Sequence, residues 1–174
     1  MRRPDQVIEL WIPNEPRPKG RPRAWGTPGG KPRIYTPEAT QNYERLVRST
    51  AIIEMQRRGW DTFRESVPLT VRIDFRLQLP MSKPYKWREK ALTGEHRPTK
   101  RPDLDNLEKS ILDGLNGTAW SDDAQIVEIY SAKWWAMEPG CMVTIKAVDI
   151  PDMDDGEMGV EDDAAESDDG HDDR

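Results

Sequence analysis

The most regular pattern of hydrophobic and polar positions lies between residues 69 and 79, where apolar residues occupy every odd position and polar residues the positions between them. A period of two predicts a β-strand with one buried face and one face in water. Val7–Ile12 predicts a shorter strand. Ile126–Trp135 and Cys141–Val148 also favour strands, and the Glu138-Pro139-Gly140 turn between them predicts an antiparallel hairpin.

Two other segments repeat their apolar residues at helical spacing. The first begins at Thr36 and Pro37, a hydroxyl N-cap followed by proline at the first helical position, and it ends at Gly59. The second runs roughly from Asn106 to Leu115. The order of elements is strand, helix, strand, helix, strand, strand. It predicts a small α/β (α+β) fold in which a mixed sheet packs against two main helices.

The remaining segments have compositions that argue against regular structure. Residues 13–35 are dense in proline and glycine, so we expect them to be irregular. Residues 80–102 predict a long loop with several cations. Residues 151–174 have almost no bulky apolar side chains, and we expect them to form a disordered acidic tail after a single domain of residues 1–150.

Charge is distributed unevenly along the chain, although the net charge is only −6. From Asp149 onward there are thirteen acidic residues and one basic residue, Arg174, so this region carries −12. The residues before it include 25 basic and 19 acidic side chains, a net +6. A basic body suits a polyanionic partner such as nucleic acid.

Several classes of protein are disfavoured by what the sequence lacks. With a single cysteine, Cys141, one chain can form neither an internal disulfide nor a cysteine metal cage. There is no P-loop or dinucleotide-binding fingerprint, and His96 and His171 do not supply a catalytic triad. The sequence has no signal-peptide-like start and no stretch near the ~20 apolar residues that a bilayer requires. We therefore expect a cytosolic protein without a membrane partner.

Two pairs of aspartates flank the second predicted helix, within the sequence RPDLDNLEKSILDGLNGTAWSDDAQIVEI. Asp103 and Asp105 lie where the cationic loop meets the helix, and Asp122 and Asp123 lie just before the next strand. A helix of about ten residues is only ~15 Å long, so we expect the return loop to bring the second pair beside the first. Such a cluster suits Mg²⁺, which prefers oxygen ligands. Lys109, four residues after Asp105, could point at a scissile phosphate or orient the attacking water.

Simpler explanations exist for each of these residues. Aspartates at a helix start usually cap the helix or interact with its dipole. Lys109 could pair with Asp105 and Asp113, each four residues away, and Asp122–Asp123 could form an ordinary turn. The combination of both acidic pairs with a strongly cationic loop is what favours a metal site.

The same residues resemble a known family. The segments RPDLDNLEKSILDGLNG and DDAQIVE, together with PRPKGRPR and the TPEAT helix start, are similar to the RusA family of Holliday-junction resolvases, which is common in phages and prophages. The resemblance spans about residues 7–148. It implies a magnesium-dependent homodimer that resolves four-way DNA junctions in recombination and repair by paired symmetric nicks. It also implies a phage or prophage protein that works in the bacterial cytosol.

The resemblance assigns roles to individual residues. It implies that Asp103, Asp105, Asp123 and Lys109 are catalytic, that the three aspartates bind Mg²⁺, and that the neighbouring Asp122 assists them. Two rival functions stay open. The carboxylates could serve cleavage of other branched DNA, such as flaps and forks, or they could only cap helices in a non-catalytic DNA-binding module.

Basic residues outside the acidic pairs are predicted to bind the DNA backbone. They are Arg17, Lys19, Arg21, Arg23, Lys100 and Arg101. Such binding releases counterions and weakens steeply with salt; alternatively, the N-terminal basic segment is a solvated arm without a partner. Trp25 and Trp87 lie in cationic loops and are the tryptophans best placed to stack on bases. We also hypothesise that the acidic tail competes with DNA for the basic segments.

Overall fold

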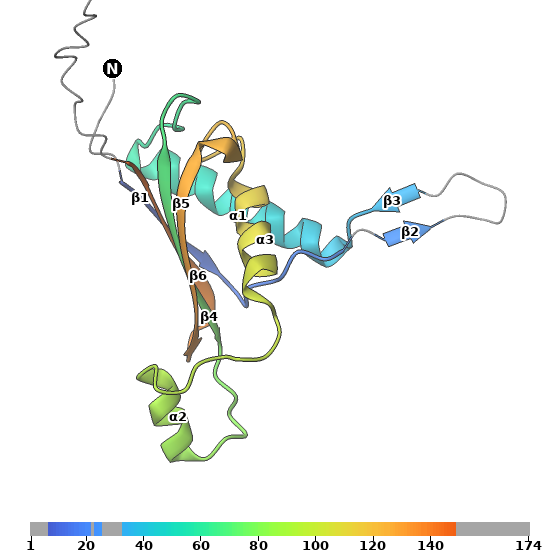
Figure 1. Cartoon of the computed structure of the whole chain (residues 1–174), viewed down its shortest axis with the longest axis vertical. Helices are drawn as coiled ribbons and strands as arrows, with labels where there is room; N and C mark the ends of the chain where they lie inside the picture. Colours follow the sequence, from blue (N-terminus) through green and yellow to red (C-terminus); the bar gives the residue numbers. More distant parts are fainter. Residues whose placement is uncertain (1–6, 22, 26–32, 149–174) are drawn as a thin grey trace, which may run out of the picture.

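The computed structural model describes residues 7–21, 23–25 and 33–148, and the predicted acidic tail lies outside these residues. Four strands form the main sheet in the order β1-β6-β4-β5. They are β1 (Val7–Pro13), β4 (Leu69–Gln78), β5 (Ile126–Ala136) and β6 (Gly140–Ala147). β6 runs antiparallel to β1 and β4, whereas β4 and β5 are parallel. The mixed sheet of the predicted α+β fold is thus confirmed (Figure 1).

The predicted hairpin between the last two strands is wrong, because β4 lies between β5 and β6. Phe75 in β4 has Lys133 of β5 on one side and Cys141 of β6 on the other. The apolar residues along residues 69–79 are all buried, whereas β5 has no buried residue, so β4 takes the centre of the sheet and β5 takes its edge. The short link after Ala136 crosses the end of β4.

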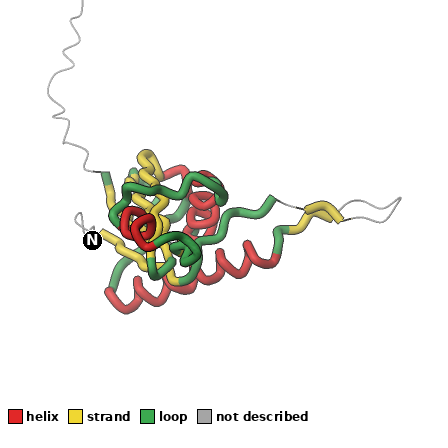
Figure 2. Tube along the Cα trace, turned by 90° about the horizontal axis from the view of Figure 1, so that it is seen from below, coloured by secondary structure: helices red, strands yellow, loops and turns green. Residues whose placement is uncertain are grey.

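Two helices cover one face of the sheet, α1 (Glu38–Arg58) and α3 (Leu104–Leu115) (Figures 1 and 2). Pro37 takes the N-cap position of α1 that was expected for Thr36. The helix ends, as predicted, at Gly59, which adopts the left-handed conformation (φ 65°). α3 begins two residues earlier than predicted. Both predicted helices are therefore present, with shifted starts.

The two helices pack against each other over a glycine. A Cβ atom on Gly114 of α3 would lie 2.6 Å from the Cγ1 atom of Val47 in α1, so a glycine permits this close approach. The core between helices and sheet is built from Ile8, Leu10, Val47, Ala51, Val71, Ile73, Phe75, Leu107, Ile111, Leu115, Trp120, Val143 and Ile145, among others. α3 is thereby fixed on the sheet, and so are the residues at its two ends.

The segment of residues 80–102, predicted as a loop without structure of its own, contains a further helix, α2 (Tyr85–Leu92). A helix of eight residues is marginal alone, so tertiary contacts decide whether it forms. Trp87 of α2 contacts Trp135 of β5, with ring centroids 6.2 Å apart. Because the two rings are far apart in sequence, the local composition gave no sign of this contact.

The proline- and glycine-rich segment also contains regular structure, contrary to the prediction. β2 (Arg23–Trp25) and β3 (Arg33–Tyr35) pair antiparallel and extend away from the body of the protein (Figure 2). Proline and glycine disfavour helices but are compatible with short hairpins. Among the described residues, no helix is long and apolar enough to cross a membrane.

Candidate functional site

α3 presents three of the predicted catalytic residues on the protein surface. Asp103 is its N-cap residue, Asp105 lies in the first turn and Lys109 lies one turn further, and all three are exposed. The Asp103 carboxylate makes no capping hydrogen bond, although the Asp103 carbonyl accepts one from the Leu107 amide (3.2 Å). Asp103 therefore does not act as a side-chain cap, and its carboxylate faces solvent.

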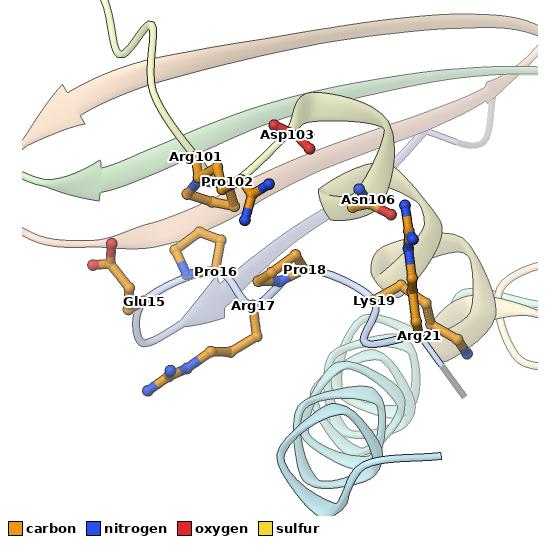
Figure 3. A pocket seen from close by; sticks show the side chains of 10 residues that line it. All are labelled: Glu15, Pro16, Arg17, Pro18, Lys19, Arg21, Arg101, Pro102, Asp103 and Asn106. Atoms are coloured by element: carbon orange, nitrogen blue, oxygen red, sulfur yellow. The ribbon is translucent and has the colours of Figure 1, made fainter. Parts of the chain in front are cut away.

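A cleft of about 690 Å³ opens beside the start of α3 (Figure 3). The segment of residues 15–21 forms one wall and the entry to α3 forms the other, with Asp103 among the lining residues. Three exposed arginines also line it: Arg17, Arg21 and Arg101. Guanidinium groups bind phosphate oxygens well. The cleft can therefore hold a phosphodiester next to an exposed carboxylate.

The basic segment that forms this wall is fastened to the body rather than loose. The Lys19 amide donates to the Asn106 carbonyl (2.7 Å), and the Ser110 hydroxyl donates to the Arg17 carbonyl (2.7 Å). The Gly20 amide donates to Thr40 Oγ1 (3.0 Å). These bonds connect the segment to both helices, so residues 15–21 do not form a freely solvated arm.

Lys19 differs from the neighbouring arginines because its side chain is used inside the protein. Its Nζ atom lies 2.5 Å from Glu44 of α1 and 2.6 Å from Asp113 of α3. Partial burial disfavours the charged ammonium, but the hydrogen bonds that it donates to Asp113 and Glu44 raise the pKa of Lys19 above its ordinary value. Lys19 thus ties the basic segment to two helices. Arg17, Arg21, Lys100 and Arg101 are exposed, whereas the Arg23 side chain lies outside the description.

The other two aspartates lie at the far end of α3, on the 3₁₀ turn η1 (Asp123–Gln125) that precedes β5. Asp122 caps this turn, since its carboxylate accepts from the Ala124 amide (2.8 Å) and the Gln125 side chain accepts from the Asp122 amide (3.1 Å). Asp123 Oδ1 accepts from Nε1 of the fully buried Trp120 (2.7 Å). Asp122 therefore fits the simpler explanation of an ordinary turn. Asp123 is instead held by the buried Trp120.

Electrostatics also single out Asp123. Burial raises the pKa of Asp123, and the negative charges of Asp113 and Asp122 add to the rise, against the opposing hydrogen bond from Trp120. A cation close to this carboxylate would relieve the repulsion. The environment is therefore unfavourable for the bare anion and favourable for a bound cation.

Within one chain, the first pair (Asp103 and Asp105) and the second pair (Asp122 and Asp123) do not meet. α3 has 12 residues and is thus about 18 Å long at 1.5 Å per residue, and the pairs lie at its opposite ends (Figure 1). Among the described residues, no group of three or more His, Cys, Asp or Glu side chains could hold a metal ion. The chain returns along α3 only as β5, after the second pair, and it is anchored where α3 ends, since the Ser121 amide donates to the Phe63 carbonyl (3.1 Å).

Sequence reasoning missed two residues that hold the pairs in place. Lys133 of β5 donates to the carbonyls of Lys100 (3.1 Å) and Pro102 (2.9 Å), which fixes the chain as it enters Asp103. Trp120 does the same for Asp123, and the Asp-x-x-Gln capping box beside it was a visible sign of a fixed turn. Lys133 gave no local sign, because its partners are 33 and 31 residues away.

Comparisons with known proteins agree with this assembly of residues. A family model described as "Endodeoxyribonuclease RusA" matches residues 13–146, a range that contains both aspartate pairs, Lys109 and the cleft. The chain is also 30% identical over 141 residues to "Uncharacterized protein YqaN" of Bacillus subtilis (strain 168). That match covers 81% of this chain and 96% of the relative. With most of its length matched in both comparisons, the chain belongs to the RusA endodeoxyribonuclease family.

Proposed function

We propose that this protein is a Mg²⁺-dependent, structure-specific endodeoxyribonuclease that resolves four-way DNA junctions by paired nicks and acts as a homodimer. The observation that carries the proposal is the position of the first pair, two exposed carboxylates at the start of α3 of which Asp103 lines a cleft together with three arginines, in a chain of the RusA family. Metal-assisted hydrolysis of a phosphodiester needs phosphate-binding cations and metal-binding carboxylates in one place. The cleft brings these two kinds of group together.

Asp103, Asp105, Asp122 and Asp123 are the residues that would hold Mg²⁺, because carboxylate oxygens are its preferred protein ligands. The donor set fits by its chemistry, since all four side chains are carboxylates, Asp103 and Asp105 are exposed, and the hydrogen bond that Asp123 accepts from Trp120 uses only Oδ1. When bound, the ion lowers the pKa of a coordinated water and offsets the charge that develops on the phosphate. The arginines of the cleft orient the phosphate, and Lys109 offers a donor one turn after Asp105.

A second copy of the chain would bring the two pairs together. β5 is an edge strand and pairs with β4 alone within the described residues. Its surface includes Val127 (60% exposed), Ile129 and Tyr130 (59% exposed). An unpaired edge that carries apolar side chains is a ready surface for another strand. Two identical strands related by a two-fold axis pair antiparallel, and such closed dimers are the commonest assemblies.

Antiparallel pairing of two β5 strands places the start of one beside the end of the other. The second pair directly precedes the start of β5. Near the end of β5, Lys133 holds the carbonyl of Pro102, the residue before Asp103. Each site would then combine the first pair of one copy with the second pair of the other copy. The dimer would contain two such sites, as two symmetric cuts require.

A synthetic four-way junction tests the proposal. We expect the wild type to nick it symmetrically in Mg²⁺. Asp105→Asn should still bind the junction but cut it more than about 100-fold more slowly, because a neutral amide is a poor Mg²⁺ ligand and even substitutions behind the ligands cost 10–100-fold. Glu65→Gln, which alters an exposed carboxylate before β4, is the matched control. Flap, fork and duplex substrates separate junction resolution from other activities, and unchanged cleavage by Asp105→Asn would contradict the nuclease site.

A further inference from the structure

Residues 80–102 form a separate, positively charged part of the molecule, here called the α2 lobe. Figure 1 shows α2 apart from the other helices, beyond one end of the sheet. The lobe contains seven lysines and arginines but only two glutamates, a net charge of +5. Arg101 belongs to the lobe and also lines the cleft. The positive surface of the lobe is therefore continuous with that of the cleft. A nucleic acid held in the cleft would therefore also meet the lobe.

The lobe is firmly attached to the sheet on one side. The Arg97 guanidinium lies 3.4 Å from the centroid of the Trp134 ring, and its Nε donates to the Lys133 carbonyl (2.8 Å). Trp87 stacks on His96 with ring centroids 5.2 Å apart and also contacts Trp135. Trp87, which the sequence suggested as a base-stacking residue, is thus committed to contacts within the protein.

The other side of the lobe carries an exposed aromatic and apolar pair. Tyr85 is 66% exposed and Met81 is 57% exposed. Arg88 lies between them, since its guanidinium carbon is 6.0 Å from the Tyr85 ring centroid and its NH1 donates to the Met81 sulfur (3.5 Å). The Glu89 carboxylate, one turn along α2, raises the pKa of the Tyr85 hydroxyl. These contacts hold an aromatic ring at the surface in a defined position.

We propose that Tyr85 and Met81 form a stacking surface for bases that are unstacked at the branch point of the DNA. The inference rests on the proposed function and adds the part of the protein that reads the branch. Duplex arms hide the faces of their bases, whereas bases at a branch can expose a face. Aromatic rings among cations bind such faces without regard to sequence, and apolar side chains can insert between base steps. The fixed ring loses little freedom on binding, which favours affinity.

The test uses full-length protein without divalent cations, so that the DNA is bound but not cut. One four-way junction carries 2-aminopurine at the branch point, and a second carries it in the middle of an arm. We expect Tyr85→Ala to bind the junction about 5- to 150-fold more weakly, the range that corresponds to ~1–3 kcal/mol for one stacked base. Duplex affinity should change less than about twofold, because the backbone contacts remain. Tyr85→Phe keeps the ring and should behave like the wild type.

Fluorescence supplies an independent reading. With Tyr85→Ala, the probe at the branch point should be brighter than with the wild type, because the quenching ring is gone, and the probe in the arm should not change. Ile53→Ala, an exposed apolar residue (61% exposed) on α1, is the matched control. Equal losses on junction and duplex, or an unchanged branch-point signal, would overturn the stacking surface. A change in oligomeric state with Tyr85→Ala would overturn it in favour of a protein contact.

The outcomes separate the two proposals. If the wild type binds junctions no better than duplexes and cuts neither, the proposed function fails. If the wild type prefers and cuts junctions, and Tyr85→Ala does so equally well, only the stacking surface fails.

Discussion

Asp103 and Asp105 stand exposed at the entry to α3, beside the arginines of the cleft, whereas Asp122 and Asp123 are built into the turn at the other end of the helix. The Asp103 carboxylate makes no capping hydrogen bond, and Lys133 fixes only the backbone that leads into the first pair. The second pair is held by a capping box and by the buried Trp120. The first pair can therefore adapt to an incoming ligand, whereas the second pair supplies fixed oxygen atoms at a cost in electrostatic free energy when no cation is present.

The largest expected effect comes from a heterodimer experiment that shows whether the two pairs act within one chain or across two chains. Asp103→Asn and Asp123→Asn should each abolish cleavage as homodimers. If sites form across the dimer, a heterodimer of these two variants keeps one site in which both pairs are intact, since both substitutions fall in the other site. Differently tagged chains can be co-expressed and the heterodimer purified. We expect it to nick one strand more than about 100-fold faster than either homodimer.

A second heterodimer provides the opposite control. It combines a wild-type chain with a chain carrying both Asp103→Asn and Asp123→Asn. Sites formed across the dimer would both be damaged, so this heterodimer should be inactive. If it cuts instead, while the first heterodimer does not, each site lies within a single chain and the pairing of two β5 strands is refuted.

Trp120→Phe should have a smaller effect and act on the second pair alone. Phenylalanine keeps a smaller aromatic ring in the core, but Asp123 loses the hydrogen bond from Nε1. Removing a group that orients a metal ligand typically costs 10–100-fold in metal affinity or activity. We therefore expect the Mg²⁺ dependence of cleavage to move to roughly 10–100-fold higher concentration. Trp60→Phe, which alters a half-buried tryptophan in the loop after α1, is the control, and an unchanged Mg²⁺ titration would reduce Trp120 to a core residue.

The sequence predicts the individual strands and helices better than their arrangement in space. The alternation along residues 69–79 and the helical spacing before Gly59 are local patterns that burial enforces, and both elements formed as expected. The position of β4 between β5 and β6 depends on competition among strands for the centre of the sheet, which no local turn signal contains. α2 likewise depends on rings more than forty residues away.

For the aspartate pairs too, local sequence predicts the residues, whereas long-range packing sets their positions. Both were identified from their position beside a predicted helix, and the capping box of Asp122 was visible in the sequence. Their separation is not predicted by the sequence, because it is set by the burial of Trp120, which anchors the chain at the end of α3 so that its return begins only with β5, after the second pair. A short helix permits either path, and only long-range packing chooses between them.

The smallest expected effect concerns stability. Because folding raises the pKa of Asp123 above its ordinary value near 3.8, the folded state binds this proton more tightly than the unfolded state does. The stabilisation from this proton is complete at pH values below the ordinary pKa of the unfolded state. It is lost as the pH rises through the higher pKa of the folded state. At neutral pH without metal, the ionised Asp123 carboxylate therefore destabilises the folded state. Asp123→Asn keeps an oxygen for Trp120, and we expect it to raise the Tm by less than roughly 2–4 °C, because solvent screens the charge of this partly exposed carboxylate.

Thermal unfolding of both proteins between pH 4 and 8, with EDTA or Mg²⁺, checks this expectation. The gain from Asp123→Asn should shrink towards pH 4, where the wild-type carboxyl takes up its proton. Mg²⁺ should stabilise the wild type more than the variant, because the ion binds the folded state and needs this carboxylate. Asp103→Asn should not raise the Tm at any pH, since Asp103 is exposed. If the two variants changed the Tm equally, the ionised Asp123 carboxylate would cost no more stability than the exposed Asp103 carboxylate, and the two pairs would differ in position alone.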